Sequence, residues 1–245
     1  MTCSIALFLY VLSEYSFDDF HLDKHEIFRV IERVTNPDKT ETSPNLRAPV
    51  GVDLKANFTE IKDVVRFCFS YSGMMINESA KVSSGKTLYA DENFFTFFSF
   101  KTIEGDPEKI LSDRNSIVLT QKIAEKLFGK KDPFGKTLKI KNQEYTVTGI
   151  VENPPLNSSI KFDVVFPLKP LIDSNPYVSW DGGMSVQTFI KIDPEATQQF
   201  ESKLPDFLWK MINANGIRVV FSRNCFFSPS KKFTFTQQQI GITWK

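Results

Sequence analysis

The strongest constraint on the fold is a succession of short apolar segments and turn signals in the middle of the chain. Residues 116–119 form a β-rich segment, and a helix with one apolar face follows, with Thr120 as its cap and Gly129 at its end. Residues 137–140 and 144–151 alternate apolar and polar positions around a short polar link, which is typical of a hairpin with one buried face. Because β-α-β units and hairpins occur together, the sequence predicts an α+β fold.

Further strands are predicted on both sides of this region from runs of β-branched and aromatic residues. They are residues 27–34, 61–69, 160–166 and 186–192, with one or two more between residues 74 and 88. The polar segment 35–49 contains two prolines before Pro49 and is predicted to be a loop.

Helices are predicted where apolar residues recur with helical spacing or where a capping residue precedes an apolar run. They are a turn at residues 22–26, a weak pattern at 50–58, a short helix from Asp91 to Phe98, a segment starting at Asp106-Pro107, and a long helix from Asp193 to about Met211. The long helix places Phe200, Leu204, Phe207 and Leu208 on one face, which we expect to be buried.

Phenylalanine is abundant, with 24 in 245 residues, and five of them lie between Phe94 and Phe100. Because each phenylalanine buries a large apolar area, we expect this stretch to lie in the core. If part of it were exposed, it would mark a surface that contacts a partner or substrate.

Two Gly-Lys-Thr triplets, at Gly85 and Gly135, resemble the end of a phosphate-binding loop. That loop also requires a glycine with four residues between it and the Gly-Lys pair, and Ala80 and Lys130 stand at those positions. We therefore interpret both triplets as turns and predict no nucleotide site.

The two histidines, His21 and His25, are four residues apart and would share one face of a helix. A zinc site would need a third ligand and usually a His-Glu-x-x-His frame, which is absent. We predict no metal site and expect His21 to be a packing and hydrogen-bonding residue where the N-terminal segment meets the domain.

Acidic residues occur in two pairs, Asp18/Asp19 and Asp91/Glu92, where turns or helix caps are expected and carboxylates are common. There is no Gly-x-Ser-x-Gly motif, and no Ser or Cys nucleophile can be paired with a base. A glycosidase pair of carboxylates has no support in the sequence. We predict no catalytic residue and no cofactor.

The charges are balanced, with a formal net charge of +1, and the basic residues are scattered rather than clustered. The chain therefore lacks the electrostatic footprint of a protein that binds nucleic acid. The three cysteines, Cys3, Cys68 and Cys225, match no metal or redox spacing and are expected to be small buried hydrophobic residues.

The N-terminus contains an apolar run, residues 4–12, that is too short to cross a bilayer, because a full span needs about 20 residues. No basic residue precedes the run, which argues against a signal peptide. The aromatic and acidic residues that follow are typical of a membrane interface. We interpret residues 1–14 as the C-terminal part of a transmembrane helix; the alternative is an ordinary buried helix.

Several segments occur in the order and spacing of one known family. They are Phe17-Asp-Asp-Phe-His21, Ile27-Phe-Arg-Val30, Tyr89-Ala-Asp-Glu-Asn-Phe-Phe, Asp106-Pro, Ser116-Ile-Val-Leu-Thr-Gln-Lys-Ile-Ala-Glu-Lys-Leu-Phe-Gly, Asp132-Pro-Phe-Gly, Tyr145-Thr-Val-Thr-Gly-Ile-Val, Val164-Val-Phe-Pro-Leu, Trp180-Asp-Gly and Gln187-Thr-Phe-Ile-Lys-Ile-Asp-Pro-Glu-Ala. Over roughly residues 10–210 the chain thus resembles the MacB-like periplasmic core domain of FtsX-type ABC transporter permeases.

The resemblance implies a porter-like βαβ subdomain with an inserted β-rich subdomain, preceded by the end of a transmembrane helix. It implies a domain on the periplasmic side of the inner (cytoplasmic) membrane, without catalytic residues of its own. The implied partners are a cytoplasmic ABC ATPase, a second permease in a homodimer or heterodimer, the membrane, and a periplasmic adaptor or a peptide or lipoprotein substrate. Nucleic acid is not among them.

Residues 211–245 depart from the family pattern, because they are rich in Ser and Gln and contain no apolar span. The peptide from Phe233 to Lys245 can be encoded so that a shifted frame reads Ile-Tyr-Phe-His-Thr-Thr-Thr-Asp-Trp-Asp-Tyr-Met-Glu, which resembles what the family places here. Our hypothesis is a frameshift between about residues 205 and 232.

We therefore expect three parts: the end of the first transmembrane helix (1–14), the extracytoplasmic core domain (15–210) and an atypical tail (211–245). The expected function is that of a permease fragment that couples cytoplasmic ATP hydrolysis to export or mechanical work. The alternative is a stand-alone secreted binding module with the same fold, and an enzyme is the least favoured reading.

Overall fold

The computed structural model describes residues 16–35, 40–70, 85–140, 142–180, 182–214 and 226–229. Its strands are β1 (Ile27–Thr35), β2 (Thr40–Ser43), β3 (Leu46–Arg47), β4 (Ile61–Ser70), β5 (Thr87–Ala90), β6 (Thr102–Glu104), β7 (Ser116–Thr120), β8 (Thr137–Ile140), β9 (Gln143–Val151), β10 (Val164–Pro167), β11 (Ser185–Ile192) and β12 (Phe226–Pro229). Its helices are α2 (Ala48–Asn57), α3 (Phe94–Phe97), α4 (Gln121–Phe128), α5 (Lys169–Asp173), the 3₁₀ turn η1 (Pro194–Ala196) and α6 (Thr197–Ala214). The predicted α+β class is confirmed.

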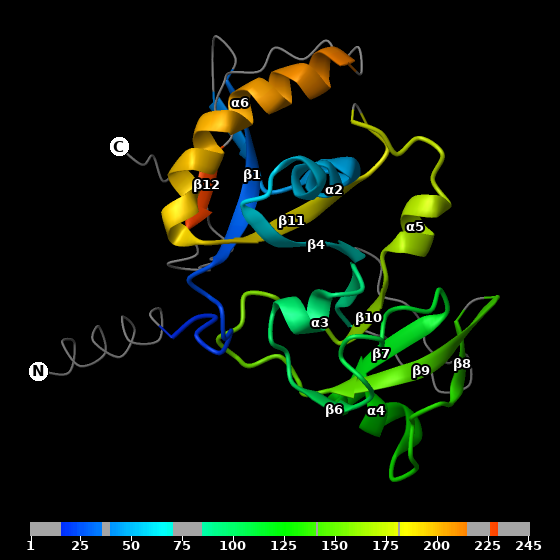
Figure 1. The fold of residues 1–245 in the computed structure, drawn as a ribbon. Helices are drawn as coiled ribbons and strands as arrows, with labels where there is room; N and C mark the ends of the chain where they lie inside the picture. Colours follow the sequence, from blue (N-terminus) through cyan, green and yellow to red (C-terminus); the bar gives the residue numbers. More distant parts are fainter. Residues whose placement is uncertain are drawn as a thin grey trace, which may run out of the picture.

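The strands of the described residues form one mixed sheet (Figure 1), with the order β12-β1-β11-β4-β5-β10-β7-β9-β6. β2, β3 and β8 lie off this path and pair with β1, β11 and β9 respectively. The middle of the chain, β5 to β10, thus occupies one half of the sheet, and β1, β4 and β11 occupy the other. In the sequence, the segment from β5 to β10 is inserted between β4 and β11. In space, its strands extend the sheet that β1, β4 and β11 form.

β11 shows why these residues form a sheet with two covered faces. It lies between β1 and β4, antiparallel to both. Phe189 faces one core cluster, whereas Ile190 and Ile192 face another, as the two-residue period of a strand requires. All three side chains are fully buried, so the strand must be covered on both sides.

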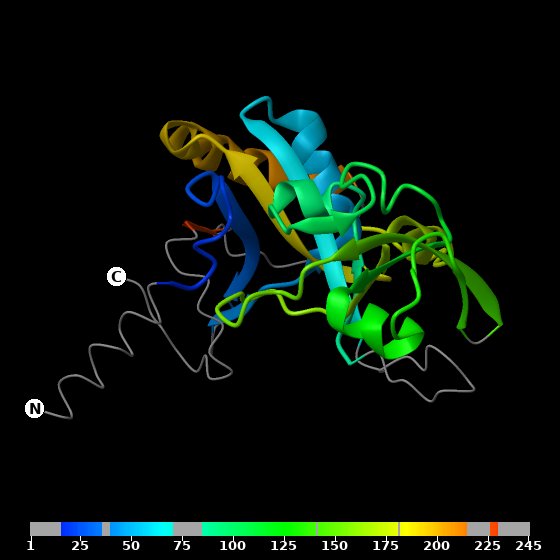
Figure 2. The same cartoon turned by 90° about the horizontal axis from the view of Figure 1, so that it is seen from below.

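Helices α2 and α6 cover the same face of β1, β11 and β4. Figure 1 shows α2 above β11 and β4 and α6 passing across β1, with α3 below β4. Seen from below in Figure 2, α3 lies in front of the strands and the two helices lie behind them. The predicted apolar face of the long helix is confirmed, because Phe200 and Leu204 are buried and Phe207 and Leu208 pack against the cluster. This cluster comprises Phe28, Val30, Leu46, Val50, Leu54, Phe58, Ile61, Ile190, Ile192, Phe200 and Leu204.

The opposite face carries the aromatic core, and the prediction for the Phe94–Phe100 stretch is confirmed. Phe94, Phe95, Phe97 and Phe98 are at most 1% exposed, and Phe100 is 6% exposed. Their rings meet mostly edge to face, which is a favourable geometry for aromatic pairs. The phenylalanines of this cluster are Phe67, Phe94, Phe95, Phe97, Phe98, Phe100, Phe162 and Phe189.

The other half of the sheet contains the predicted β-α-β unit. β7 runs parallel to β9, and α4 connects them by way of β8, which forms the predicted hairpin with β9. Ile123 and Ala124 of α4 are buried against this half. Gly129 ends the helix with a φ of 62°, a left-handed conformation that favours glycine.

The predicted loop at residues 35–49 is wrong in part, because β2 and β3 lie within it. β2 pairs with β1, and β3 pairs with β11 through Leu46 and Val186. Both are short strands at the side of the sheet, where backbone pairing imposes no apolar alternation on the sequence.

The helix predicted to start at Asp106 is also wrong, because turns extend from residue 107 to 115. Asp106 does accept the backbone N–H of Glu108 at 3.1 Å, but the chain then turns so that Ile110 and Leu111 enter the core. Burial of two successive apolar residues prevails here over the local capping signal.

Two predicted elements are shorter than expected. The strand predicted at residues 160–166 begins only at Val164, and Ile160 and Phe162 before it are buried without strand pairing. The helix predicted from Asp91 to Phe98 is the single turn α3, and the Asp91 side chain does not cap it.

Several predictions fall outside the described residues. They concern the membrane segment at residues 1–14, Cys3 and Cys225, the strands expected before residue 85, and most of the tail after residue 214. Within the described ranges, no helix has both the length and the apolar character needed to cross a membrane.

Candidate functional site

Residues 16–26 directly precede β1, and we call them the N-terminal junction. Asp18 in this junction has a φ of 56°, and its backbone N–H donates to the Asn157 carbonyl at 2.9 Å. The Asp18 carboxylate accepts the backbone N–H of Ser159 at 2.8 Å and its hydroxyl at 2.5 Å. The Asn157 side chain in turn donates to the Ser16 carbonyl at 2.5 Å. These bonds tie the junction to the loop before β10.

Unfavourable backbone conformations concentrate at this junction. Among the described residues, Asp18 and Ser99 are the non-glycine residues with positive φ, at 56° and 54°. Ser99 accepts the backbone N–H of Leu22 through its hydroxyl at 3.3 Å, so both residues belong to junction contacts. Such conformations cost about 1–3 kcal/mol and persist only where surrounding contacts enforce them. The junction is therefore held in one defined geometry.

His21 is the buried centre of the junction. Its Nδ1 donates to the Phe98 carbonyl, and its ring lies against the rings of Phe20, Phe98 and Phe100. Its Nε2 lies 3.8 Å from an oxygen of Asp18. The prediction that His21 packs and forms hydrogen bonds is confirmed, whereas His25, four residues later, is exposed.

Burial shifts the protonation of both groups. Burial lowers the pKa of His21 to about 4, although the hydrogen bond to Phe98 opposes this shift. Burial raises the pKa of Asp18 to about 6, against the opposing effect of the hydrogen bonds from Ser159. In both groups the shift of the pKa favours the uncharged form, because the surroundings of the junction are apolar.

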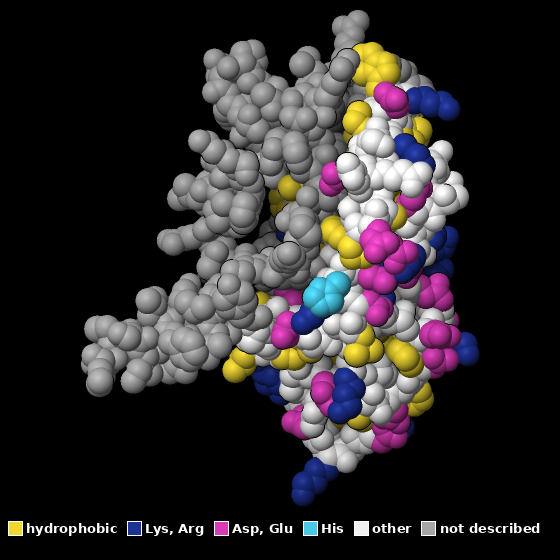
Figure 3. Space-filling view, turned by 60° about the vertical axis from the view of Figure 1, so that its left-hand side comes forward, with side chains coloured by type: hydrophobic (Ala, Val, Ile, Leu, Met, Phe, Trp, Pro, Cys, Tyr) yellow, Lys and Arg dark blue, Asp and Glu magenta, His cyan; other side chains and the backbone are white. Residues whose placement is uncertain are grey.

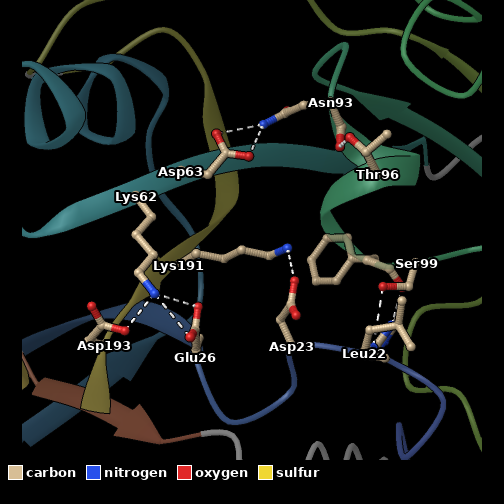
Figure 4. A network of polar contacts seen from close by, with 12 residues as sticks. Leu22, Asp23, Glu26, Lys62, Asp63, Asn93, Thr96, Ser99, Lys191 and Asp193 are labelled. Carbon is tan, nitrogen blue, oxygen red and sulfur yellow. Dashed lines mark hydrogen bonds and ion pairs between the residues drawn. The ribbon is translucent and has the colours of Figure 1, made fainter. Parts of the chain in front are cut away.

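Ion pairs connect the end of the junction to the half of the sheet that contains β1, β4 and β11 (Figure 4). Lys62 of β4 donates to Glu26 at 3.0 Å and to Asp193 at 2.5 Å. Lys191 of β11 donates to Asp23 at 2.7 Å, and its ammonium lies 5.1 Å from the centre of the Phe97 ring. The junction is thus bonded to both halves of the sheet, to β4 and β11 on one side and to the loop before β10 on the other.

A second polar cluster joins the two halves of the sheet directly, through β4 and the segment after β5. Arg66 of β4 donates to both carboxylate oxygens of Asp91, at 2.8 and 2.9 Å, and to the Ala48 carbonyl at 2.8 Å. Nearby, the Asn93 amide donates to both oxygens of Asp63 at 2.9 Å. Asp91, which was expected to cap a helix, instead anchors the start of α3 to β4.

A groove of about 700 Å³ lies beside this cluster. Its wall includes Arg66, Asp91, Glu108, Arg114, Leu168 and Asp173. Charges of both signs are intermingled in it and also over the face in Figure 3, where hydrophobic side chains are dispersed among them. A groove without one prevailing charge selects no class of ligand by electrostatics.

Replacement of Arg66 by glutamine is expected to lower the free energy of unfolding by about 2 kcal/mol, because it leaves the Asp91 carboxylate without its charged partner. The two side chains are only 14% and 18% exposed. Urea unfolding of the full chain in mild detergent measures this. The matched control is Arg114→Gln, which removes a 3.3 Å pair with Asp173 that is 65% and 38% exposed, and about 0–1 kcal/mol is expected there. Equal losses in the two variants would contradict the structural role of Arg66.

The remaining candidate residues from the sequence do not converge on one site. Gly85 and Gly135, of the two Gly-Lys-Thr triplets, have φ values of 60° and 71° and lie in turns, as predicted. Cys68 is partly buried, and burial raises the pKa of its thiol to about 11. In the part of the chain that the structure covers, no three His, Cys, Asp or Glu residues are grouped as metal ligands.

Sequence reasoning missed Asp18 and Arg66 as key residues. Asp18 was grouped with Asp19 as an ordinary turn acid, and the pairing of Arg66 with a carboxylate 25 positions away has no local signal. The motif Phe17-Asp-Asp-Phe-His21 contained the available hint, because its acid and its histidine turn inward together.

Comparison with known proteins identifies the family. The family model of the MacB-like periplasmic core domain matches residues 1–207. No curated protein sequence matches the chain significantly.

Three solved structures share the fold. A domain of a protein described as a permease from Porphyromonas gingivalis is 21% identical, with a TM-score of 0.63, and the match covers 80% of this chain and 83% of that one. The periplasmic region of MacB from Actinobacillus actinomycetemcomitans is 17% identical, with a TM-score of 0.57 and coverage of 83% and 88%. The extracellular domain of the ABC-type transporter YknZ from Gram-positive bacteria is 14% identical, with a TM-score of 0.55 and coverage of 78% and 95%. The chain belongs to the MacB-like periplasmic core domain family and is a periplasmic domain of the kind found in MacB-like ABC transporter permeases.

Proposed function

We propose that this chain couples cytoplasmic ATP hydrolysis to export or mechanical work across the membrane, as a non-catalytic part of an ABC transporter permease. Its partners are a cytoplasmic ABC ATPase and a second permease in a homodimer or heterodimer, together with a periplasmic adaptor or a peptide or lipoprotein substrate. The domain lies on the periplasmic side of the inner membrane, and residues 1–14 are the end of the first transmembrane helix.

The observation that carries this proposal is the N-terminal junction. Ser16, at the start of the junction, lies two residues beyond the segment assigned to the membrane helix. Asp18 and Asn157 tie the junction to one half of the sheet, and Lys62 and Lys191 tie it to the other. A displacement of the membrane helix would therefore move the whole domain instead of being absorbed in a flexible linker.

The extracytoplasmic location is tested by labelling in intact cells. A cysteine introduced at Tyr177, which is 78% exposed, is expected to react with a membrane-impermeant maleimide without cell lysis. Recovery of the chain with washed membranes, and not in the soluble fraction, is expected from the same cells. A soluble chain would favour the stand-alone secreted module, and a cysteine that reacts only after lysis would contradict both functions.

Coupling is tested by hydrogen exchange of the permease reconstituted with its ATPase in nanodiscs. ATP is expected to change the hydrogen-exchange rates of the junction and of residues 155–161. With an ATPase variant that binds but does not hydrolyse ATP, we expect the change caused by ATP binding without the reversal that follows hydrolysis. The double variant Lys62→Ala/Lys191→Ala removes the ion pairs to Glu26, Asp193 and Asp23. We expect it to retain ATP hydrolysis but to lose the exchange response in β4 and β11, with Lys101→Ala, from an exposed pair elsewhere, as the control. Wild-type exchange that is insensitive to ATP would contradict the coupling function.

A further inference from the structure

The most exposed large hydrophobic side chains of the described residues lie at the N-terminal junction. Leu156 is 97% exposed and Leu22 is 84% exposed. Leu22 belongs to the junction itself, and Leu156 precedes Asn157, which is hydrogen-bonded to Ser16 and Asp18. Isolated exposed leucines are common on proteins, but both of these adjoin residues that attach the junction to the sheet.

Leu156 is held at the tip of a fixed turn. The backbone N–H of Ser158 donates to the Pro155 carbonyl at 2.9 Å, which closes a turn with Leu156 and Asn157 at its centre. The Lys161 ammonium donates to the carbonyls of Pro155 and Leu156. Because the backbone is already ordered, insertion of this leucine into a partner would require little further loss of conformational entropy.

Positive charge lies directly behind the tip. The Lys161 ammonium binds the carbonyl of Leu156 itself, at 2.8 Å. Burial lowers the pKa of Lys161, and the charge of Lys86 adds to this shift, whereas the charge of Asp18 opposes it. An apolar tip with a lysine beside it suits an anionic lipid surface, since lysine side chains extend along apolar regions towards headgroup phosphates.

The position of the tip along the chain limits its distance from the end of the N-terminal apolar segment. Ser16 lies two residues beyond residue 14, and an extended chain spans at most about 3.6 Å per residue, so Ser16 is within about 7 Å of the end of the membrane segment. The headgroup layer on each side of a bilayer is about 5–8 Å thick. Asn157 is hydrogen-bonded to Ser16, so, if residues 1–14 end in the membrane as proposed, the neighbouring Leu156 is close enough to their end to reach the headgroups.

We propose that the turn at residues 155–158 inserts Leu156 into the surface of the bilayer in which residues 1–14 end. Leu22, which is 84% exposed in the same junction, enters the same surface, and the Lys161 ammonium beside the tip lies near the lipid phosphates. This inference rests on the proposed function, because it takes the N-terminal segment as membrane-embedded. It gives the domain a second contact with the bilayer, which fixes the orientation of the junction relative to the membrane.

The test uses tryptophan fluorescence of the full chain in vesicles of phosphatidylcholine and phosphatidylglycerol with brominated acyl chains. Leu156→Trp places a reporter at the tip, and Leu9→Trp places one in the apolar N-terminal run. Tyr177→Trp is the matched control at another exposed site, where the side chain is 78% exposed. Emission is compared with that of the chain that carries only its native tryptophans.

We expect the added emission of the Leu156→Trp and Leu9→Trp variants to shift to the blue and to be mostly lost in brominated vesicles, with no loss in Tyr177→Trp. Quenching at residue 9 without quenching at residue 156 would overturn this inference and leave the membrane attachment intact. Absence of quenching at both sites would overturn both proposals, and equal quenching at residues 156 and 177 would show non-specific adsorption and also overturn the inference. Quenching at residue 156 alone would contradict the membrane helix and would also overturn the inference in this form, because the inference takes residues 1–14 as membrane-embedded.

Discussion

Replacement of Phe98 by alanine is expected to lower the free energy of unfolding by about 3–5 kcal/mol, the range for a large aromatic side chain removed from a packed core. Phe98 is fully buried, and the centroid of its ring lies 4.9 Å from the ring centroid of Phe97 and 5.2 Å from that of Phe189. It therefore connects the turn α3 to the central strand β11. Urea unfolding of the full chain in mild detergent measures the loss.

Two further variants isolate the cause of this loss. Phe98→Leu keeps most of the buried volume and is expected to cost about 1–2 kcal/mol, because the cavity is smaller. Phe134→Ala removes the same side chain from a site that is 40% exposed, and about 1 kcal/mol or less is expected. If Phe98→Ala were no more harmful than Phe134→Ala, the aromatic cluster would not be the core of this domain.

The aromatic core could be predicted from the sequence because its signal is local. Five phenylalanines within seven positions leave too few polar residues for an exposed helix, whatever the tertiary structure. The hairpin of β8 and β9 and the helix α4 were predicted for the same reason, since alternation, spacing and the terminal Gly129 all lie within a few residues. Such elements are determined by their own sequence.

The parts that sequence reasoning missed depend on distant partners. β2 and β3 form because their backbones pair with those of β1 and β11. The polar sequence of β2 contains no local signal of a strand. Asp91 would be a plausible cap if Arg66 were not beside it on β4. Likewise, the burial of Asp18 follows from the loop that contains Asn157 and Ser159, which lies 141 positions away.

The stability of wild-type protein is expected to show little net dependence on pH between 4 and 6 from Asp18 and His21, because their contributions oppose each other. The folded-state pKa of Asp18 is raised to about 6, so its contribution is present below pH 3.8 and is lost as the pH rises through 6. The folded-state pKa of His21 is lowered to about 4, so its contribution is present above pH 6.5 and is lost as the pH falls through 4. In this window the pair holds one proton in the folded state and one in the unfolded state.

Single substitutions are expected to expose each contribution. In Asp18→Asn the term from His21 remains, so stability relative to wild type should increase with pH by at most about 1.4 kcal/mol per unit, or about 2 kcal/mol in total from pH 4 to 6. In His21→Gln the term from Asp18 remains, and stability relative to wild type should decrease by a similar amount over the same range. Urea unfolding at half-unit pH intervals measures both, and subtraction of the wild-type profile removes the titration of all other carboxylates.

The signs of the two slopes distinguish this account from a simple loss of contacts. Either substitution removes hydrogen bonds of the junction, but a lost contact lowers stability equally at every pH and produces no slope relative to wild type. Slopes of opposite sign require that the folded junction disfavours both the aspartate anion and the imidazolium cation, as burial does. Slopes of the same sign, or none, would show that the two side chains keep their ordinary protonation and that water reaches the junction. In that case the junction would be too loosely packed to transmit a displacement of the N-terminal segment to the sheet.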